Sequence, residues 1–247
     1  MKRTLDIVLS IIGLLAASPV LLPVMVLVWK QDWRSPFYVA PRVGEGGRLF
    51  VMVKLRSMIV GADKSGVDST SASDQRITAV GHFIRRYKLD ELTQLWNVLI
   101  GDMSLVGPRP NVKRETDLYT AEEKKLLRVK PGITDFASIV FSDEGDVLKD
   151  KADPDIAYNQ LIRPGKGLLG LFYIENRTIW LDIQLCFLTG LSVLSRPRAL
   201  AAVCSLLRAR GASNHLVRIA SRLDPLVPAF PAGGDRIVTS RDGNPFV

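Results

Sequence analysis

The chain has 247 residues, of which 47% are hydrophobic, and a mean hydropathy of +0.15, values that exclude a protein built from many membrane spans. Its net charge is +8, which favours polyanionic partners such as nucleic acid, acidic lipid head groups or phosphorylated substrates. The two cysteines exclude a disulfide framework, and the two histidines argue against zinc sites and histidine-based catalytic triads.

The first feature along the chain is an uncharged apolar run from Ile7 to Trp29, which spans about 35 Å as a helix and is long enough to cross a bilayer core. Three interpretations compete: a cleaved signal peptide, a simple spanning helix, and a helix that enters the membrane, bends and leaves on the same side. Pro19 and Pro23 favour a bend, because each proline removes a helix hydrogen bond.

Charged residues flank the run on both sides. Loop lysine and arginine prefer the cytoplasm, so a crossing helix would misplace one of the basic flanks. Asp6, on the first flank, either caps the helix or pairs with Lys2 or Arg3. The basic residues after the run are Lys30, Arg34, Arg42 and Arg48. The residues alone leave the choice between a spanning and a re-entrant helix open.

Short elements follow the apolar run. Residues 36–60 predict two strands separated by the turn Gly-Glu-Gly-Gly, and the small polar residues 61–76 predict a loop. We expect a helix over Val80–Tyr87 and a second one that starts at Asp90 and stops at Gly101. The second helix is indicated by apolar residues at helical spacing, which are Leu92, Leu95, Trp96 and Leu99.

The second half of the chain predicts further helices. Residues 114–130 contain one, with Thr120 and Glu123 at the spacing of a capping box. Residues 155–163 predict a short helix, and residues 178–194 predict an apolar one that is interfacial or packed in the core. After that the composition shifts to arginine, glycine and proline, and we expect a basic extension that is partly flexible.

The acidic pair Asp90–Glu91 is the main candidate for chemistry. Aspartate at a helix start is an ordinary N-cap, so a structural role is the simplest interpretation of Asp90 alone. The surroundings argue for more, because cations near a carboxylate keep it ionised and also hold phosphates. These cations are Arg85, Arg86 and Lys88 just before the pair, and Arg109 in the stiff turn Pro108-Arg109-Pro110.

This arrangement predicts phosphoryl transfer through a covalent intermediate. A carboxylate close to a bound phosphate can attack phosphorus and form an acyl phosphate. The repulsion between the two anions would be cancelled by Mg²⁺ held by Glu91, since hard cations take carboxylate and phosphate oxygens. Adjacent residues at a helix start point about 100° apart, so Asp90 can face the phosphorus while Glu91 faces the metal.

Several motifs occur together and in order. The most specific is RRYKLDELTQLWNVLIGDMSLVGPRP, residues 85–110. The others are KRTLD (2–6), Ser18-Pro19, KLRSM (54–58), DQRIT (74–78), VKPGIT (129–134) and NRTIWLDIQL (176–185). Through them the chain resembles the bacterial polyprenyl-phosphate sugar-1-phosphate transferases, the monotopic phosphoglycosyl transferases, from about residue 2 to about residue 194.

The resemblance implies a reaction. Asp90 would attack the β-phosphate of a UDP-sugar, expel UMP and carry the sugar phosphate as an aspartyl adduct, which undecaprenyl phosphate then accepts. Glu91 would hold Mg²⁺. The residues implied at phosphate or nucleotide are Arg85, Pro108, Arg109 and Pro110, with Lys54, Arg56 and Arg86 as helpers. Without the resemblance, Lys54 and Arg56 alternate on a predicted strand and are equally explained as a solvated face.

The resemblance also implies a membrane topology. Lys2, Arg3 and Asp6 match a membrane-entry motif, and Ser18-Pro19 matches the bend of a re-entrant helix. Both ends of that helix would stay at the cytoplasmic face of the bacterial inner membrane. The expected fold is α+β, with a re-entrant helix over residues 1–30, a small, mainly helical cytoplasmic domain with a β-hairpin and interfacial helices over residues 31–195, and the basic extension over residues 196–247.

The chain departs from the family pattern after VKPGIT. Asp135 replaces a glycine, and Asp143, Glu144 and Asp146 stand where the family often has an arginine. The choice of sugar therefore does not transfer from relatives. We hypothesise that Glu144 accepts hydrogen bonds from sugar hydroxyls, and we expect the arginine-rich extension to contact anionic membrane lipid.

Other functions fit parts of the sequence. A catalytically silent membrane scaffold for polysaccharide assembly needs the anchor and the basic surface but not the acidic pair. A Mg²⁺-dependent phosphohydrolase would transfer to water. The apolar run and the lack of a recognisable reading helix argue against nucleic acid as a partner. The sequence leaves open the sugar, the glycan and whether the protein forms a homodimer.

Overall fold

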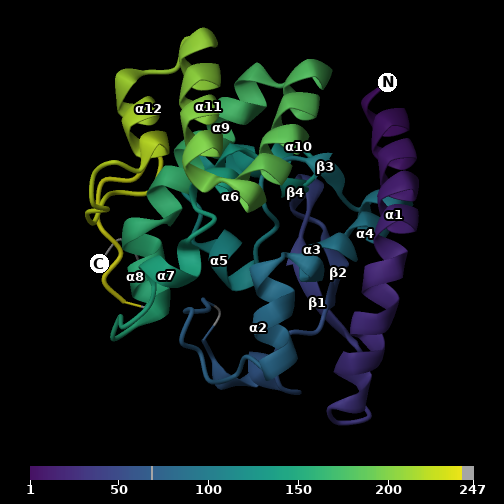
Figure 1. Ribbon diagram of the computed structural model, residues 1–247. Helices are drawn as coiled ribbons and strands as arrows, with labels where there is room; N and C mark the ends of the chain where they lie inside the picture. The colour runs from purple at the N-terminus through teal and green to yellow at the C-terminus, as the bar shows by residue number, and fades with distance from the viewer. Residues whose placement is uncertain (68, 241–247) are drawn as a thin grey trace.

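The computed structural model describes residues 1–67 and 69–240. It combines helices with two small sheets (Figure 1). The helices are α1 Lys2–Lys30, α2 Ala79–Arg86, α3 Leu89–Leu92, α4 Leu95–Ile100, α5 Lys113–Asp117, α6 Phe136–Val140, α7 Glu144–Val147, α8 Pro154–Leu161, α9 Arg163–Asn176, α10 Ile179–Leu194, α11 Arg196–Ala209 and α12 Asn214–Ser221. The strands are β1 Phe37–Val43, β2 Leu49–Leu55, β3 Ser104–Val106 and β4 Gly132–Thr134, and the 3₁₀ helices are η1 Glu45–Gly47, η2 Ala62–Ser65 and η3 Glu123–Arg128.

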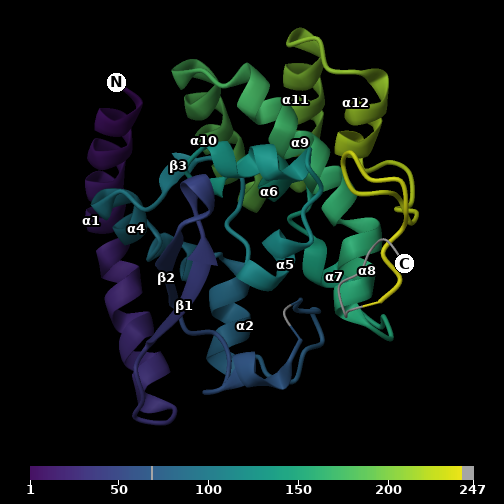
Figure 2. The same cartoon turned by 180° about the vertical axis from the view of Figure 1, so that it is seen from behind.

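The long helix α1 forms one edge of the molecule, and α12 with the C-terminal tail forms the opposite edge (Figures 1 and 2). The β1–β2 hairpin and α4 lie beside α1, while α8, α9, α11 and α12 lie on the other side of the molecule. Residues 85–110 include α3, α4 and β3, so this motif leads from the first half of the fold to the second.

Helix α1 is continuous through Pro19 and Pro23. Among the described residues it is the helix long and apolar enough to cross a membrane, and only 17% of its most apolar stretch is buried. Ser18 Oγ donates a hydrogen bond to the Leu15 carbonyl at 2.8 Å, which is the acceptor that Pro19 leaves without its usual N–H. The re-entrant topology stays a prediction, since a continuous helix fits both a crossing and a turning path.

The N-terminal part of α1 is attached to the body of the protein. Asp6 is 4% exposed, and its carboxylate accepts hydrogen bonds from Ser104 Oγ at 3.0 Å and from the Leu105 N–H at 3.1 Å. The expectation that Asp6 caps the helix or pairs with Lys2 or Arg3 is wrong, because strand β3 brings buried donors to this carboxylate, and such donors need an acceptor.

Lys2 and Arg3 make further contacts between the start of α1 and the rest of the protein. Lys2 Nζ lies 2.5 Å from Asp182 Oδ2 on α10. Arg3 donates hydrogen bonds to the carbonyls of Leu99, at 2.7 Å, and Val98, near the C-terminal end of α4, where a cation also complements the helix dipole. The KRTLD motif therefore connects α1 to α4, β3 and α10.

The hairpin and α2 agree with the sequence-based expectations. Strands β1 and β2 are antiparallel, with Tyr38 opposite Lys54, and α2 lies within one residue of the expected helix. The helix expected from Asp90 to Gly101 is interrupted between α3 and α4. At the interruption the Thr93 hydroxyl donates to the Val53 carbonyl on β2 at 3.2 Å, so a tertiary contact accompanies the break.

The prediction of a single helix over residues 114–130 is wrong, because α5 and η3 are separated by a loop. The capping box is nevertheless present. The Glu123 N–H donates to Thr120 Oγ1, and the Thr120 N–H donates to Glu123 Oε2, both at 3.0 Å. Arg163 Nη2 lies 2.6 Å from the same carboxylate, so the turn is fixed to α9 by a buried ion pair.

The main hydrophobic core lies among α6, α9, α10, α11 and α12. The helix expected over residues 155–163 is α8, and α9 follows it without having been expected. Glycines lower helix propensity, but in α9 they permit close packing. A Cβ atom at Gly165 would lie 2.6 Å from the Phe141 ring, and one at Gly170 would lie 2.8 Å from the Leu126 side chain.

The C-terminal extension belongs to the same core, to which α11 and α12 contribute Leu207 and Leu216 among others. Beyond α12 the described chain makes specific contacts along α8. The Ala229 N–H donates to the Gln160 carbonyl at 3.0 Å, and Gln160 Nε2 donates to the Val238 carbonyl at 2.7 Å. The rest of the tail expected to be flexible, residues 241–247, lies outside the described residues.

Candidate active site

The acidic pair occupies the first turn of α3. This helix begins directly after Lys88, whose backbone is left-handed with φ of 53°. This conformation is unfavourable for a residue with a side chain and persists where the surrounding structure enforces it. Leu89 holds the turn in place, since it is buried in a cluster with Leu55 on β2 and with residues of α1. None of the described side chains caps α3, so Asp90 is not the N-cap that its position alone would suggest.

Asp90 faces a cation on the neighbouring strand. Its side chain is 13% exposed, and its Oδ2 lies 3.8 Å from Lys54 Nζ. Burial raises the pKa of Asp90, Lys54 opposes the rise, and the Glu91 charge adds to it, so that the net shift of the pKa is upward. The charged form of Asp90 therefore depends on its cationic neighbours.

Glu91 binds Arg109, with 2.7 Å between Oε1 and Nη2. Burial alone would raise the pKa of Glu91, but Arg109, Lys54 and Lys88 together lower it to about 2. The pKa values of the two adjacent carboxyl groups are therefore shifted in opposite directions, Glu91 downward and Asp90 upward. Such a divergence is typical of carboxylates with different roles.

The turn Pro108-Arg109-Pro110 is placed by the β3–β4 sheet. The Gly132 N–H donates to the Pro108 carbonyl at 3.0 Å. A Cβ atom at Gly132 would lie only 2.1 Å from the Gly107 nitrogen, so the close approach of the two strands requires glycine. The prolines restrict the backbone on either side of Arg109, and its guanidinium reaches the acidic pair.

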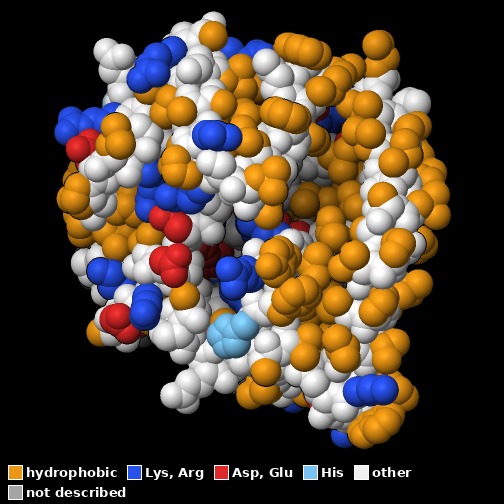
Figure 3. All heavy atoms as spheres, viewed as in Figure 1, with side chains coloured by type: hydrophobic (Ala, Val, Ile, Leu, Met, Phe, Trp, Pro, Cys, Tyr) orange, Lys and Arg blue, Asp and Glu red, His pale blue; other side chains and the backbone are white. Residues whose placement is uncertain are grey.

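A second ion pair adjoins the first. Lys166 on α9 pairs with Glu144 on α7 through Nζ and Oε2. Burial alone would raise the pKa of Glu144, but Lys166, Arg109 and Arg85 lower it. Lys166 and Arg109 line one pocket together with Asp135. On the face shown in Figure 3, basic and acidic side chains gather around a hollow near the middle of the molecule, beside an extended apolar surface.

Asp135, which stands where the family has a glycine, caps α6. Its Oδ1 accepts hydrogen bonds from the Ser138 N–H and the Ser138 hydroxyl, both at 2.7 Å. Burial raises the pKa of Asp135, although the bonds from Ser138 and the charges of Lys166 and Arg109 oppose the rise. The replacement therefore has a structural explanation at the wall of the pocket.

Lys166 is a site residue that the sequence-based predictions did not include, whereas Lys88 was predicted only as one of the cations near the acidic pair. Lys88 lies two residues before Asp90, and this proximity marked it in the sequence. Lys166 lies on α9, a helix that the sequence did not predict, so no local pattern marked it. Its position became evident only when the fold brought α9 to Arg109 and Glu144.

Arg56 lies outside the site, although it was expected to assist phosphate binding. It is 7% exposed, and its guanidinium binds both oxygens of Asp32 at 2.5 and 2.7 Å. It also donates to the Ser35 carbonyl at 2.9 Å. Arg56 therefore fastens the chain that follows α1 to the end of β2, while Lys54, two residues earlier, faces the acidic pair.

The two arginines at the end of α2 differ. The charge of Arg85 lowers the pKa of Asp90 and of Glu144, so its charge acts on both carboxyl groups. Arg86 is exposed, with its guanidinium carbon 5.9 Å from the centre of the Tyr87 ring. The structure thus brings Arg85 to the site and leaves Arg86 at the surface.

The donor set for a metal ion is small. Among the described residues, no group of three or more His, Cys, Asp or Glu side chains is close enough to hold a metal. Mg²⁺ often uses only one or two carboxylates, however, with water and substrate phosphates completing its shell. Glu91, strongly acidic and 16% exposed, fits that use together with the oxygens of a bound substrate.

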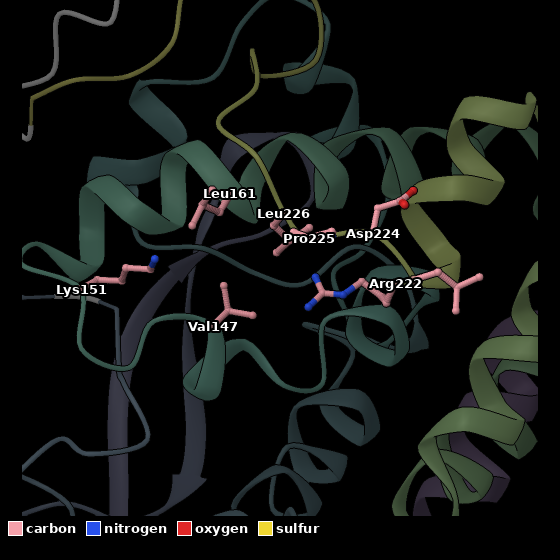
Figure 4. Close-up of a pocket in the computed structure, with 8 residues that line it drawn as sticks. Val147, Lys151, Leu161, Arg222, Asp224, Pro225 and Leu226 are labelled. Carbon is pink, nitrogen blue, oxygen red and sulfur yellow. The ribbon is translucent and has the colours of Figure 1, made fainter.

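A further hollow lies between α7, α8 and the C-terminal tail (Figure 4). Arg222 and Lys151 extend into it, and Val147 and Leu161 form part of its wall. None of the described residues that we expected in the active site lines this hollow. Arg222 Nη2 also lies 2.9 Å from Asp143, the residue before Glu144.

The chain is similar in sequence to known proteins. The family model described as bacterial sugar transferase matches residues 1–196. The undecaprenyl-phosphate galactose phosphotransferase of Salmonella typhimurium is 36% identical over 217 residues, which cover 81% of this chain and 41% of the relative. The undecaprenyl-phosphate glucose phosphotransferase of Komagataeibacter xylinus is 41% identical over 198 residues, which cover 76% of this chain and 35% of the relative. The chain thus spans about two fifths of the length of these relatives. Because the family model covers most of its length, the chain belongs to the bacterial sugar transferase family.

Proposed function

We propose that this protein transfers a sugar-1-phosphate from a UDP-sugar to undecaprenyl phosphate and so starts a membrane-linked glycan. The family and the printed activities of the relatives support this proposal. The single observation that carries the mechanism is the half-buried Asp90 carboxylate beside Lys54, next to a Glu91 that Arg109 keeps ionised. The relatives are named for different sugars, so the donor sugar remains to be measured.

Asp90 supplies the nucleophile. One of its oxygens attacks the β-phosphorus of the donor, an oxygen–phosphorus bond forms, and the bond from that phosphorus to the bridging oxygen breaks. UMP leaves with the electron pair as a phosphate anion. An oxygen of undecaprenyl phosphate then attacks the same phosphorus, and the Asp90 carboxylate is released, giving the lipid diphosphate sugar.

The cations around Asp90 hold the donor in position. Lys54, Arg85 and Arg109 place positive charge where the diphosphate must lie, which reduces the repulsion between two anions and orients the phosphorus toward Asp90. Glu91 would hold Mg²⁺, which would neutralise charge on the phosphate oxygens and on the departing UMP. Arg109 would then shift part of its interaction from Glu91 to the phosphate.

The membrane supplies the acceptor. Exposed apolar side chains continue from α1 onto α4 and α10, and they are Trp96, Ile100, Trp180, Ile183 and Phe187. Apolar surface also extends beyond α1 on the face drawn in Figure 3. Such surfaces favour an interface with lipid. We place α1 as a re-entrant helix at the cytoplasmic face of the bacterial inner membrane, where a soluble donor and a lipid acceptor can meet.

The proposal is tested with the full chain in nanodiscs that contain undecaprenyl phosphate. A panel of UDP-sugars with Mg²⁺ should yield UMP and a lipid product of the expected mass for at least one sugar. Rapid quenching and mass spectrometry should detect a sugar phosphate on Asp90. Asp90→Asn should lose the adduct and the product, whereas Asp224→Asn, at an exposed ion pair on the surface, should keep both.

The outcome separates the alternatives. Lipid product without any modified Asp90 would overturn the covalent mechanism. Release of free sugar-1-phosphate and UMP without a lipid product would favour the phosphohydrolase, and no turnover with any UDP-sugar would favour the silent scaffold.

A further inference from the structure

Lys166 on α9 and Glu144 on α7 form an ion pair, and Lys166 lines a pocket together with Arg109 of the candidate active site. Their side chains are 16% and 32% exposed, so the pair is partly covered yet reachable. Lys166 Nζ also lies 5.1 Å from the centre of the Tyr158 ring. The two residues come from α9 and α7, which no motif in the sequence connects.

The pair belongs to the same group of charges as Arg109. The Glu144 charge raises the pKa of Arg109, and the Lys166 charge lowers the pKa of Lys88 beside the acidic pair. Lys166 and Arg109 line one pocket, with Asp135 and Tyr158 in its wall. Lys166 thus borders the pocket where Arg109 would meet a phosphate.

The two cations have equivalent arrangements. Arg109 is bound to Glu91, and Lys166 is bound to Glu144. A nucleoside diphosphate brings several negative charges into this region, and an ammonium group, with three donors and a flexible stem, can exchange a carboxylate for a phosphate oxygen. Glu144 then loses its partner and is exposed enough to accept hydrogen bonds from hydroxyl groups.

We propose that Lys166 binds a phosphate group of the nucleoside diphosphate donor, and that Glu144 is a competitor which the donor displaces from Lys166. This inference rests on the proposed function, because it assumes that the donor occupies the region between Asp90 and Arg109. It assigns a role to two residues outside the acidic pair and its motif. Glu144, released by the donor, is then available to the sugar.

The test uses binding of UDP, which carries the diphosphate but has no sugar to transfer. Lys166→Ala should weaken UDP binding about tenfold, as expected for the loss of one charge-assisted hydrogen bond. Glu144→Gln should have the opposite sign and tighten UDP binding, because the competitor for Lys166 is removed. Lys166→Arg should largely restore affinity, and Lys113→Ala, at an exposed ion pair outside the pocket, should leave it unchanged.

Isothermal titration of the full chain in nanodiscs with Mg²⁺ measures these affinities, and thermal unfolding identifies variants that are merely destabilised. The double variant Lys166→Ala/Glu144→Gln should bind UDP like Lys166→Ala alone. A purely structural ion pair predicts equal loss of stability in both single variants and no opposite shifts in affinity, which would overturn the inference.

The measurements distinguish a failure of the Lys166 inference from a failure of the proposed transferase function. Normal transfer to lipid with unchanged UDP affinity in Lys166→Ala overturns the role of Lys166 and leaves the proposed function intact. UDP binding with the predicted opposite shifts but no lipid product overturns the transferase proposal alone. A wild-type protein that does not bind UDP overturns both.

Discussion

Lys54 is the residue on which the charge of Asp90 most directly depends. Burial and the nearby Arg109 lower the pKa of Lys54 from its usual value to about 8, although Asp90 and Glu91 act to raise it. The ammonium is therefore largely charged at neutral pH, and the charge is lost as the pH rises through about 8. A neutral Lys54 leaves Asp90 with less compensation and weakens the attraction for phosphate. We expect activity to fall on the alkaline side near this pH.

The variant Lys54→Arg tests this expectation. Arginine stays charged throughout the alkaline range, so the alkaline fall in kcat/KM for the UDP-sugar should move to higher pH. The acidic limb should remain, because Asp90 must be ionised to attack and burial raises its pKa above the usual value. An unchanged alkaline limb in a folded arginine variant would assign that limb to another group.

Residues whose partners lie within the ordered motif were predictable, and residues with distant partners were not. Asp90, Glu91 and Arg109 meet as the motif implies. Asp6 finds its partners almost one hundred residues away on β3. Arg56 was expected in the site from the resemblance alone, and the alternative, a solvated strand face shared with Lys54, is also wrong, because β2 ends at Leu55 and Arg56 is buried.

At the scale of elements, α1 is attached to the body at both ends. Lys2, Arg3 and Asp6 hold its N-terminal part, and Arg56 holds the chain at Asp32, just beyond its C-terminal end. Between them, buried residues of α1 pack against β2, α2 and α3, in a cluster of Leu21, Val24, Val28, Leu55, Ile84 and Leu89. Helix α1 therefore supports the element that carries the acidic pair.

Arg56→Ala separates attachment from substrate binding. Removing the two-point ion pair with Asp32 should speed proteolysis within residues 31–36 and lower the melting temperature. UDP affinity, measured well below that temperature, should stay close to wild type, whereas Lys54→Ala should weaken it. A loss of UDP affinity in Arg56→Ala without faster proteolysis would return Arg56 to the phosphate site.

Elements were predicted best where local pattern and tertiary packing agree. The hairpin and α2 formed as expected. Helix α9 was missed because Pro164 and its glycines weaken the local signal, while in the fold the proline occupies the first turn, where it is tolerated. Helices α11 and α12 were missed because the composition of the extension resembles that of a flexible tail, although their apolar residues complete the main core.

At the scale of the whole molecule, the extension beyond the family segment binds Asp143, the residue before Glu144. Arg196 and Arg222 each lie 2.9 Å from Asp143 Oδ2, next to Glu144 at the start of α7. Arg222 comes from the end of α12, past residue 196, where the family match ends. The position of Glu144, and hence its contact with Lys166, therefore depends on a part of the chain that the family motif does not include.

This dependence predicts a local effect of Arg222→Gln. Arg222 is 9% exposed, and loss of its charged hydrogen bond to Asp143 should cost about 2 kcal/mol in the free energy of unfolding. Arg196 still compensates Asp143, so the protein should fold, with faster hydrogen exchange at residues 143–148 and unchanged exchange in α2. Arg218→Gln, on the same helix but in an exposed pair with Asp224, is the matched control and should change neither quantity. Equal exchange at residues 143–148 in the two variants would mean that α7 is held by its own contacts, and that the extension contributes to the core alone.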